Sequence, residues 1–312
     1  MALSFLSRKA RVATITIEED AIRYVELKSV SPLQLSAAEE LALPAGVIEN
    51  GTINDAKTLG SILDEAVNQW GLSKKSVRFL APDEFVIIRK VTYPKDVKVD
   101  ELKGHFFIEM GSTVYLPFED PVFDVVPYRE DAEEPEAIII ASKESVVKSY
   151  ESAFEEAKVK PVVADITPLA LYRLAYLEHD FQEEEHIMVI DMNNTKMTVS
   201  IFCEHYPLFM RSIDLEDTNK ISVKPALLFE TIEEEIEKLS NFYRYNLNGG
   251  GAGITKIVCN TTQEIYEELR FRMEARFSVP FLPIVISHID LNETDAIPPR
   301  FNRAIGLALK EV

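Results

Sequence analysis

Long hydrophobic runs are missing from this sequence of 312 residues. A helix that crosses a bilayer needs about 20 predominantly apolar residues, and no stretch approaches that length, so the sequence predicts no membrane-spanning helix. Cysteine is also scarce, because Cys203 and Cys259 are the only two and both lie in apolar, strand-like segments. They stand at no metal-ligand spacing, so we expect small core residues in a reducing compartment.

Recognisable catalytic and metal-binding motifs are absent as well. The five histidines are scattered, and none has a histidine or cysteine partner at a zinc spacing. The chain has no Walker phosphate loop and no nucleophile elbow. Its many carboxylates show no spacing that selects a general acid and base. The sequence therefore predicts no catalytic residue and no metal site.

Negative charge dominates, with 52 acidic and 33 basic residues and a formal net charge of −19. Such a surface repels phosphate backbones and anionic lipids, so we expect no nucleic-acid binding and little direct attraction to a membrane. The start is an exception, because the apolar stretch Leu3–Leu6 precedes the basic stretch Arg8–Arg11. This segment is either a weak membrane-contacting segment or a frayed stretch before the first strand, and the frayed stretch is favoured. It lacks the order of a secretory signal, so we expect a cytoplasmic protein.

A hairpin pattern occurs twice. Residues Val12–Leu27 and Ile187–Phe202 align without a gap, and each is an apolar run, a short polar turn and a second strand-forming run. A strand–turn–strand unit of this kind opens each lobe of the actin-like ATPase fold. The repeat therefore predicts an α/β protein with the two-lobed, actin-like (ribonuclease H-like) fold. The alternative is two unrelated hairpins, which are common in a chain of this length.

The chain between the two hairpins changes character at Pro82. From there to Lys158 the pattern is a strand over Phe85–Val91, followed by helix, strand, strand and helix, which is typical of a compact α+β subdomain. Before it, Asn54 is the expected cap of a helix over Asp55–Trp70. We predict a first lobe of residues 1–82 and 159–185, an inserted subdomain of 83–158, and a second lobe of 186–312. Three prolines in Tyr115–Pro127 favour an edge strand or irregular segment.

Several blocks resemble one family, the type IV pilus assembly protein PilM. They are LPAGVIENGTIND (Leu43–Asp55), FIEMGSTVYLPFEDPVFDVVP (Phe107–Pro127), VVADITPLALYRL (Val162–Leu174), FMRSIDL (Phe209–Leu215) and RAIGLALK (Arg303–Lys310). Their order along nearly the whole chain carries the resemblance. It implies an actin-like fold with a subdomain inserted in the first lobe, similar to the cell-division protein FtsA.

The resemblance also implies a function and a partner. Family members are cytoplasmic ATP-binding proteins at the inner face of the cell membrane. They hold the short cytoplasmic N-terminal tail of a membrane-anchored partner, PilN, in a groove between the first lobe and the insert. This implies a scaffold in a type IV pilus or competence-type machine, and self-association stays open.

The expected phosphate-binding turns depart from the family. Glycine amides approach the phosphates there, whereas Glu18–Asp20 forms the first turn of this chain. In the second turn, Asp191 could hold a magnesium-bound water, Asn193 stands at the expected glycine, and Asn194 and Thr195 follow, with Thr195 as a hydroxyl donor.

Two further elements depart as well. The strand Ile257–Cys259 is followed by Asn260, where family members have two glycines. The glycine-rich stretch Asn248–Gly253 comes before that strand, and at this place a flexible connection is favoured over a phosphate cradle. Glu216 follows the strand that ends at Leu215, where family members often have glycines. We therefore expect no cofactor, and poor binding of Mg-ATP at most.

These observations predict a non-catalytic scaffold that grips an extended peptide. The candidate contact residues are apolar side chains of the insert: Phe85, Ile87, Phe106, Met110 and Leu116. An extended peptide would lodge alternate side chains among them; the other interpretation is that they form the core of the insert. The alternative function is an active ATPase or a sugar-kinase relative of the same superfamily.

Overall fold

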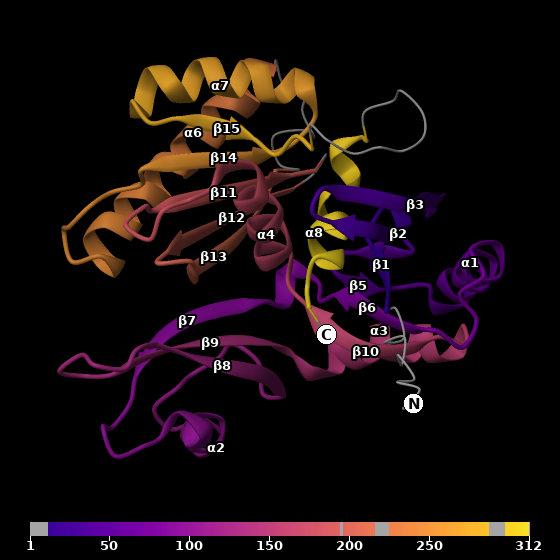
Figure 1. Cartoon of the computed structure of the whole chain (residues 1–312), viewed down its shortest axis with the longest axis horizontal. Coiled ribbons are helices and arrows are strands. Elements are labelled where there is room, and N and C mark those ends of the chain that lie inside the picture. The colour runs from indigo at the N-terminus through magenta and orange to yellow at the C-terminus, as the bar shows by residue number, and fades with distance from the viewer. Residues whose placement is uncertain (1–11, 194–195, 216–224, 287–296, 312) are drawn as a thin grey trace, which may run out of the picture.

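The computed structural model describes residues 12–193, 196–215, 225–286 and 297–311. Within these ranges the strands form two five-stranded sheets, one three-stranded sheet and a two-stranded hairpin (Figure 1). Of the helices in the described ranges, none combines the length and the apolar character that a membrane crossing requires.

The first five-stranded sheet has the order β10-β6-β1-β2-β3. Its strands are β1 (Ala13–Ile17), β2 (Ala21–Val30), β3 (Leu33–Ala42), β6 (Ser76–Leu80) and β10 (Lys160–Asp165). The first three strands run antiparallel, and β6 and β10 continue the sheet in parallel from β1. A small hairpin of β4 (Ile48–Glu49) and β5 (Thr52–Ile53) follows β3.

The second five-stranded sheet repeats this plan in the order β13-β12-β11-β14-β15. Its strands are β11 (Ile187–Met192), β12 (Lys196–Cys203), β13 (Tyr206–Asp214), β14 (Lys256–Asn260) and β15 (Phe281–Pro283). The register repeats as well, because Ile15 pairs with Tyr24 and the aligned Ile190 pairs with Val199. The two hairpins open two separate sheets, so the predicted two-lobed fold is confirmed.

Helices cover both sheets. On the first sheet lie α1 (Ala56–Gln69) and α3 (Glu144–Glu156), and on the second lie α6 (Pro225–Phe242), the π-helical turn η3 (Tyr243–Leu247) and α7 (Gln263–Phe277). The predicted cap of α1 is wrong by one residue. Asp55 accepts a hydrogen bond from the N–H of Thr58, as an N-cap must, whereas the Asn54 side chain donates to Glu49 in the β4–β5 hairpin.

Two helices lie between the lobes. They are α4 (Thr167–His179) and α8 (Asn302–Ala308), the latter preceded by the turn η4 (Pro299–Phe301). Apolar side chains from both sheets pack around them, including Val25 of β2 and Val189 of β11. A Cβ atom on Gly306 would lie 2.1 Å from the backbone oxygen of Ala170, so only glycine permits this approach of α8 to α4. The base of the interlobe region is therefore apolar and tightly packed.

The inserted sheet has the order β7-β9-β8. Its elements are η1 (Asp83–Phe85), β7 (Ile87–Thr92), η2 (Val99–Glu101), α2 (Leu102–Glu109), β8 (Pro121–Arg129) and β9 (Glu136–Lys143). The strand predicted from Phe85 begins only at Ile87, because a 3-10 turn precedes it. Pro121 and Pro127 stand on the edge strand β8, as their missing N–H groups require.

The insert contacts the second lobe as well as the first lobe, from which it extends. One face of its sheet packs with α2, whereas Ile88 and Ile138 on the other face join the core shared with both lobes. β7 lies beside β13 (Figure 1), and Arg129 forms a 2.7 Å ion pair with Glu204. The predicted boundary at residue 158 counts α3 with the insert, although α3 also packs on α1 and β10. The boundaries remain a prediction.

Candidate functional site

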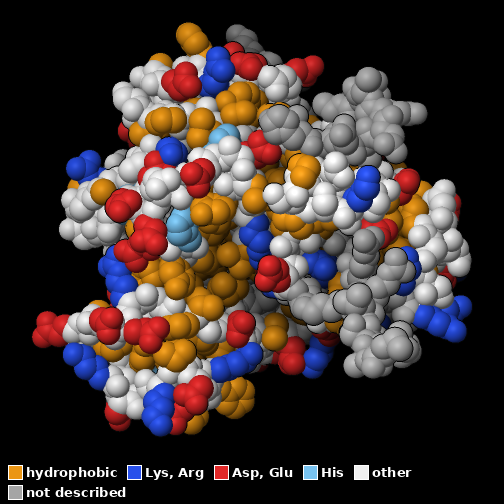
Figure 2. All heavy atoms as spheres, viewed as in Figure 1, with side chains coloured by type: hydrophobic (Ala, Val, Ile, Leu, Met, Phe, Trp, Pro, Cys, Tyr) orange, Lys and Arg blue, Asp and Glu red, His pale blue; other side chains and the backbone are white. Residues whose placement is uncertain are grey.

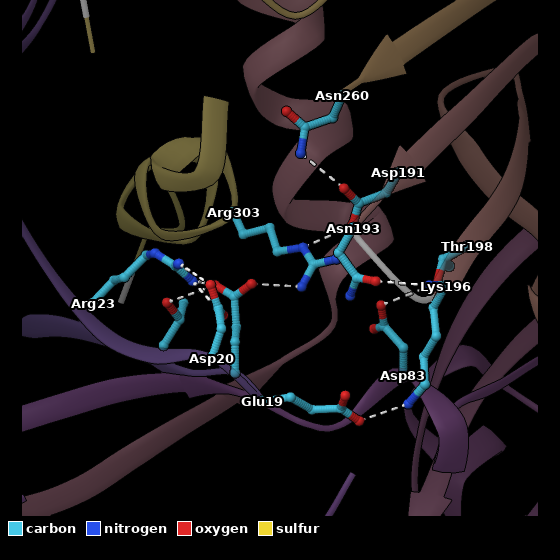
Figure 3. A network of polar contacts seen from close by, with 12 residues as sticks. Glu19, Asp20, Arg23, Asp83, Asp191, Asn193, Lys196, Thr198, Asn260 and Arg303 are labelled. Carbon is cyan, nitrogen blue, oxygen red and sulfur yellow. Dashed lines mark hydrogen bonds and ion pairs between the residues drawn. The ribbon is translucent and has the colours of Figure 1, made fainter. Parts of the chain in front are cut away.

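The turns of the two repeated hairpins face each other across a cavity of about 650 Å³ between the lobes. The turn after β1, the turn after β11, the root of the insert, the end of β14 and α8 contribute its walls. Its described lining includes seven acidic and four basic side chains, a formal excess of three negative charges. Figure 3 shows how most of these charges converge.

One arginine of the same sheet pairs with carboxylates of the first turn. Arg23 of β2 is buried and bonds to Glu18 at 3.0 Å, Asp20 at 2.6 Å and Glu40 at 2.6 Å. Burial disfavours the charged guanidinium, but the carboxylates of Glu18 and Asp20 outweigh it and hold the pKa of Arg23 above its ordinary value. Burial likewise opposes ionisation of Asp20, and the bond from Arg23 nevertheless lowers the pKa of that carboxyl. The turn is thus built as a carboxylate cluster around one arginine.

The second turn holds two of the residues predicted from the sequence. Asp191, at the end of β11, is buried and accepts hydrogen bonds from Asn260 at 2.8 Å and Arg303 at 2.7 Å. Asn193 closes the turn, because its side-chain oxygen accepts the N–H of Lys196 at 2.8 Å. Asn194 and Thr195 lie outside the described residues. Both carboxylate oxygens of Asp191 thus accept hydrogen bonds from the protein, and whether Asp191 also holds a magnesium-bound water stays a prediction.

Two basic side chains connect the lobes across the cavity (Figure 3). Arg303 of α8 donates to Glu18 at 2.7 Å and to Asp191 at 2.7 Å, so it joins the first turn to the second. Lys196, the first residue of β12, donates to Glu19 at 2.8 Å and also to Glu84 in η1. Lys196 therefore ties the second lobe both to the first turn and to the root of the insert.

A further carboxylate, Asp83, lies next to these bridges. The hydroxyl of Thr198 donates to its Oδ2 at 3.4 Å, and its buried Oδ1 has no hydrogen-bond partner among the described residues. Burial, together with the neighbouring Asp191 and Glu84, raises the pKa of Asp83 to about 7, although Arg303 opposes the shift. At neutral pH this carboxyl is thus only partly ionised.

The predicted peptide-contact residues divide into groups. Phe106 is buried in the core of the insert, and Met110 and Leu116 pack partly buried against the same core. Met110 and Leu116 also line a second cavity of about 470 Å³, walled by residues 110–121. Ile87 stands opposite Ala141 on the α2-facing side of the sheet. Phe85 ends η1 and is half-buried. Whether these residues contact a partner stays a prediction.

Sequence reasoning missed the most exposed apolar residues of the insert. Phe107 is 73% exposed, Ile108 is 77% exposed and Tyr115 is 64% exposed. It also missed Arg23, Lys196 and Arg303, which form ion pairs with carboxylates of the turns. No sequence pattern marks a basic residue as the partner of a distant carboxylate. The one local signal for such a role was the position of Lys196 directly after the second turn.

The arrangement defines a class of protein. Two lobes that repeat one hairpin-led sheet around a cleft belong to the actin-like fold, and solved structures with that fold resemble this one. A protein of unknown function with an actin-like ATPase fold from Bacteroides thetaiotaomicron has a TM-score of 0.50 at 9% identity, covering 99% of this chain and 100% of that one. The ethanolamine utilization protein EutJ from Carboxydothermus hydrogenoformans has a TM-score of 0.51 at 9% identity, covering 96% and 89%.

A family model narrows the class. The model described as type IV pilus assembly protein PilM matches residues 14–224, more than half of the chain. The chain therefore belongs to the type IV pilus assembly protein PilM family. A solved PilM–PilN type IV pilus biogenesis complex has a TM-score of 0.76 at 18% identity, covering 96% of this chain and 98% of that one. A search of curated proteins returns no significant match.

Proposed function

We propose that this chain is a non-catalytic scaffold of a type IV pilus or competence-type assembly machine, and that it binds the cytoplasmic tail of a membrane-anchored, PilN-like partner. The observation that carries the non-catalytic part is the pairing of the cleft's basic side chains with its own carboxylates. The likeness to a solved PilM–PilN complex supports the choice of partner. The partner would hold this acidic chain at the inner face of the membrane.

The cleft does not fit a nucleoside triphosphate. Carboxylates at Glu18 and Glu19 stand where amide-presenting glycines would approach the phosphates, and they repel an anion. Lys196 and Arg303, the cations that could compensate, are engaged with two carboxylates each. Freeing them would leave those buried or half-buried carboxylates unpaired, which is costly. Tight ATP binding and hydrolysis therefore have no support in this geometry.

The insert supplies the surface that we assign to the partner's tail, on its own exposed face and not in the groove with the first lobe that the family resemblance implies. Phe107, Ile108 and Tyr115 are exposed there, and the cavity that Met110 and Leu116 line opens beside them. Figure 2 shows apolar side chains gathered in the hollow between the insert and the second lobe as well. Exposed apolar side chains that gather on one surface mark interaction sites, whereas single scattered ones are normal. A short extended peptide would insert its apolar side chains here.

The test measures direct binding of a synthetic peptide that has the sequence of the partner's cytoplasmic N-terminal tail. Fluorescence anisotropy of the labelled peptide reports the binding. We expect a roughly micromolar dissociation constant, because a short peptide buries little area and loses conformational entropy on binding. Tyr115→Asp should weaken binding by about tenfold or more, since it places a charge at the mouth of an apolar cavity.

Tyr245→Asp is the matched control, because Tyr245 is 62% exposed but lies in η3 of the second lobe. It should bind the peptide within about twofold of the unmodified protein. Equal weakening by both substitutions, or no binding of the peptide to the unmodified protein, would remove the basis for assigning this surface.

A further inference from the structure

The interlobe bridges form a connected set. Arg303 reaches Glu18 of the first lobe and Asp191 of the second, and Lys196 of the second lobe reaches Glu19 of the first and Glu84 at the root of the insert. The Lys196 side chain is only 10% exposed, so water screens these pairs much less than surface pairs.

We propose that Lys196 and Arg303 act as a built-in clamp that holds the two lobes closed over the cleft without any ligand, and that Lys196 fixes the root of the insert in the same closed state. The clamp goes beyond the scaffold proposal, because it concerns the free protein. It gives the scaffold one fixed shape that does not depend on a bound small molecule.

The charges explain why the clamp has to exist. Without Lys196, the carboxylates of Glu19 and Glu84 would face each other, with Asp83 and Asp191 nearby. Like charges that water screens only in part repel each other. Separation of the lobes would relieve that repulsion by admitting water. The ammonium group of Lys196 is thus the element that makes the closed cleft electrostatically stable.

The packing explains which movement remains available. At the base of the cleft, α4 and α8 stay joined by apolar side chains of both lobes and by the close approach of Gly306 to Ala170. These contacts do not involve the charges of the clamp. Between the insert and the second lobe, β7 packs beside β13 and Tyr128 contacts Tyr206, and these contacts also do not involve the clamp. The ion pair of Arg129 and Glu204 is about half exposed, and exposed pairs contribute little. Removing the clamp should therefore let the first lobe rotate about these remaining apolar contacts.

The experiment measures the distance between the lobes in the free, full-length protein. Spin labels are placed at Lys57→Cys on α1 and Ala275→Cys on α7, both exposed, while the native Cys203 and Cys259 are buried. Lys196→Met keeps an unbranched side chain that is one heavy atom shorter, and it removes the charge. Double electron–electron resonance should then show a longer mean distance and a broader distribution.

Lys238→Met is the matched control, because Lys238 also pairs with two carboxylates, Glu234 and Glu235, but all three lie on α6. Its distance distribution should equal that of the unmodified protein. If Lys196→Met fails to fold, the double variant Glu19→Gln and Glu84→Gln tests the same bridges. It leaves neither of these carboxylates unpaired, and it should also broaden the distance distribution. An unchanged distribution in the folded variants would overturn the clamp, whatever the result of the peptide-binding test.

Discussion

Asp83 is the residue in the cleft whose ionisation should be visible in solution. Its carboxyl faces Arg303, Asp191 and Glu84, and the hydroxyl of Thr198 donates to it. The folded protein holds its proton up to a pKa of about 7, whereas the ordinary value is 3.8. Because the folded state binds this proton more tightly than the unfolded chain does, its contribution to stability falls as the pH rises from about 4 toward 7.

Asp83→Asn should abolish this loss, because the amide is neutral at every pH. The free energy of unfolding of the variant, relative to the unmodified protein, should therefore rise by about 2 kcal/mol between pH 5 and pH 7.5. Urea unfolding at several pH values measures the difference, and its value at pH 5 is the internal reference. A difference that does not change with pH would mean that Asp83 is ionised normally in the fold.

The individual residues of the cleft were only partly predictable. Glu18, Glu19 and Asp20 follow a strand directly, so the sequence identified them as the first turn and indicated their conflict with a phosphate. Their partners come from far along the chain, because Lys196 is 177 residues from Glu19 and Arg303 is 285 residues from Glu18. No local pattern marks a basic residue as the partner of a carboxylate so distant. The ion pairs within the cleft could therefore be found only from the three-dimensional structure.

At the scale of elements, α8 is the part whose placement decides the site. It carries Arg303 into the cleft, and its position depends on Gly306 lying against the backbone of α4. A methyl group at that point meets backbone atoms, which cannot move aside as a flexible side chain would.

Gly306→Ala should therefore destabilise the protein by about 2–3 kcal/mol in urea unfolding. Gly60→Ala is the control, because Gly60 also lies inside a helix, α1, and has nothing within 4 Å of the position of the added Cβ. That change should be neutral or stabilise by up to about 1 kcal/mol. If Gly306→Ala were as stable as Gly60→Ala, the close contact of α4 and α8 would not hold α8 in place.

The elements themselves were largely predictable, and the reason is local. An apolar run, a short polar turn and a second strand-forming run specify β1 with β2 and β11 with β12, and helical spacing specifies α1. The prediction failed where a short turn interrupts an apolar run, as η1 does before Ile87. It also could not show that Ile88 and Ile138 face the second lobe, because that contact depends on how whole sheets pack.

At the scale of the whole molecule, the order of family-like blocks predicted the two-lobed fold and the family. The sequence could not show that the cleft is bridged, because that requires both lobes in place. We propose an acidic scaffold that its own ion pairs hold closed, with an apolar surface on the insert for a partner and a cleft that works without a nucleotide.

Isothermal titration calorimetry of the full-length protein with Mg-ATP tests that claim most directly. The account predicts no saturable heat up to millimolar nucleotide, and no rise in the free energy of unfolding, whereas a ligand present at 100 times its dissociation constant would add about 2.7 kcal/mol. A low-micromolar dissociation constant would contradict the account, because it would mean that Lys196 and Arg303 release their carboxylates to bind phosphate.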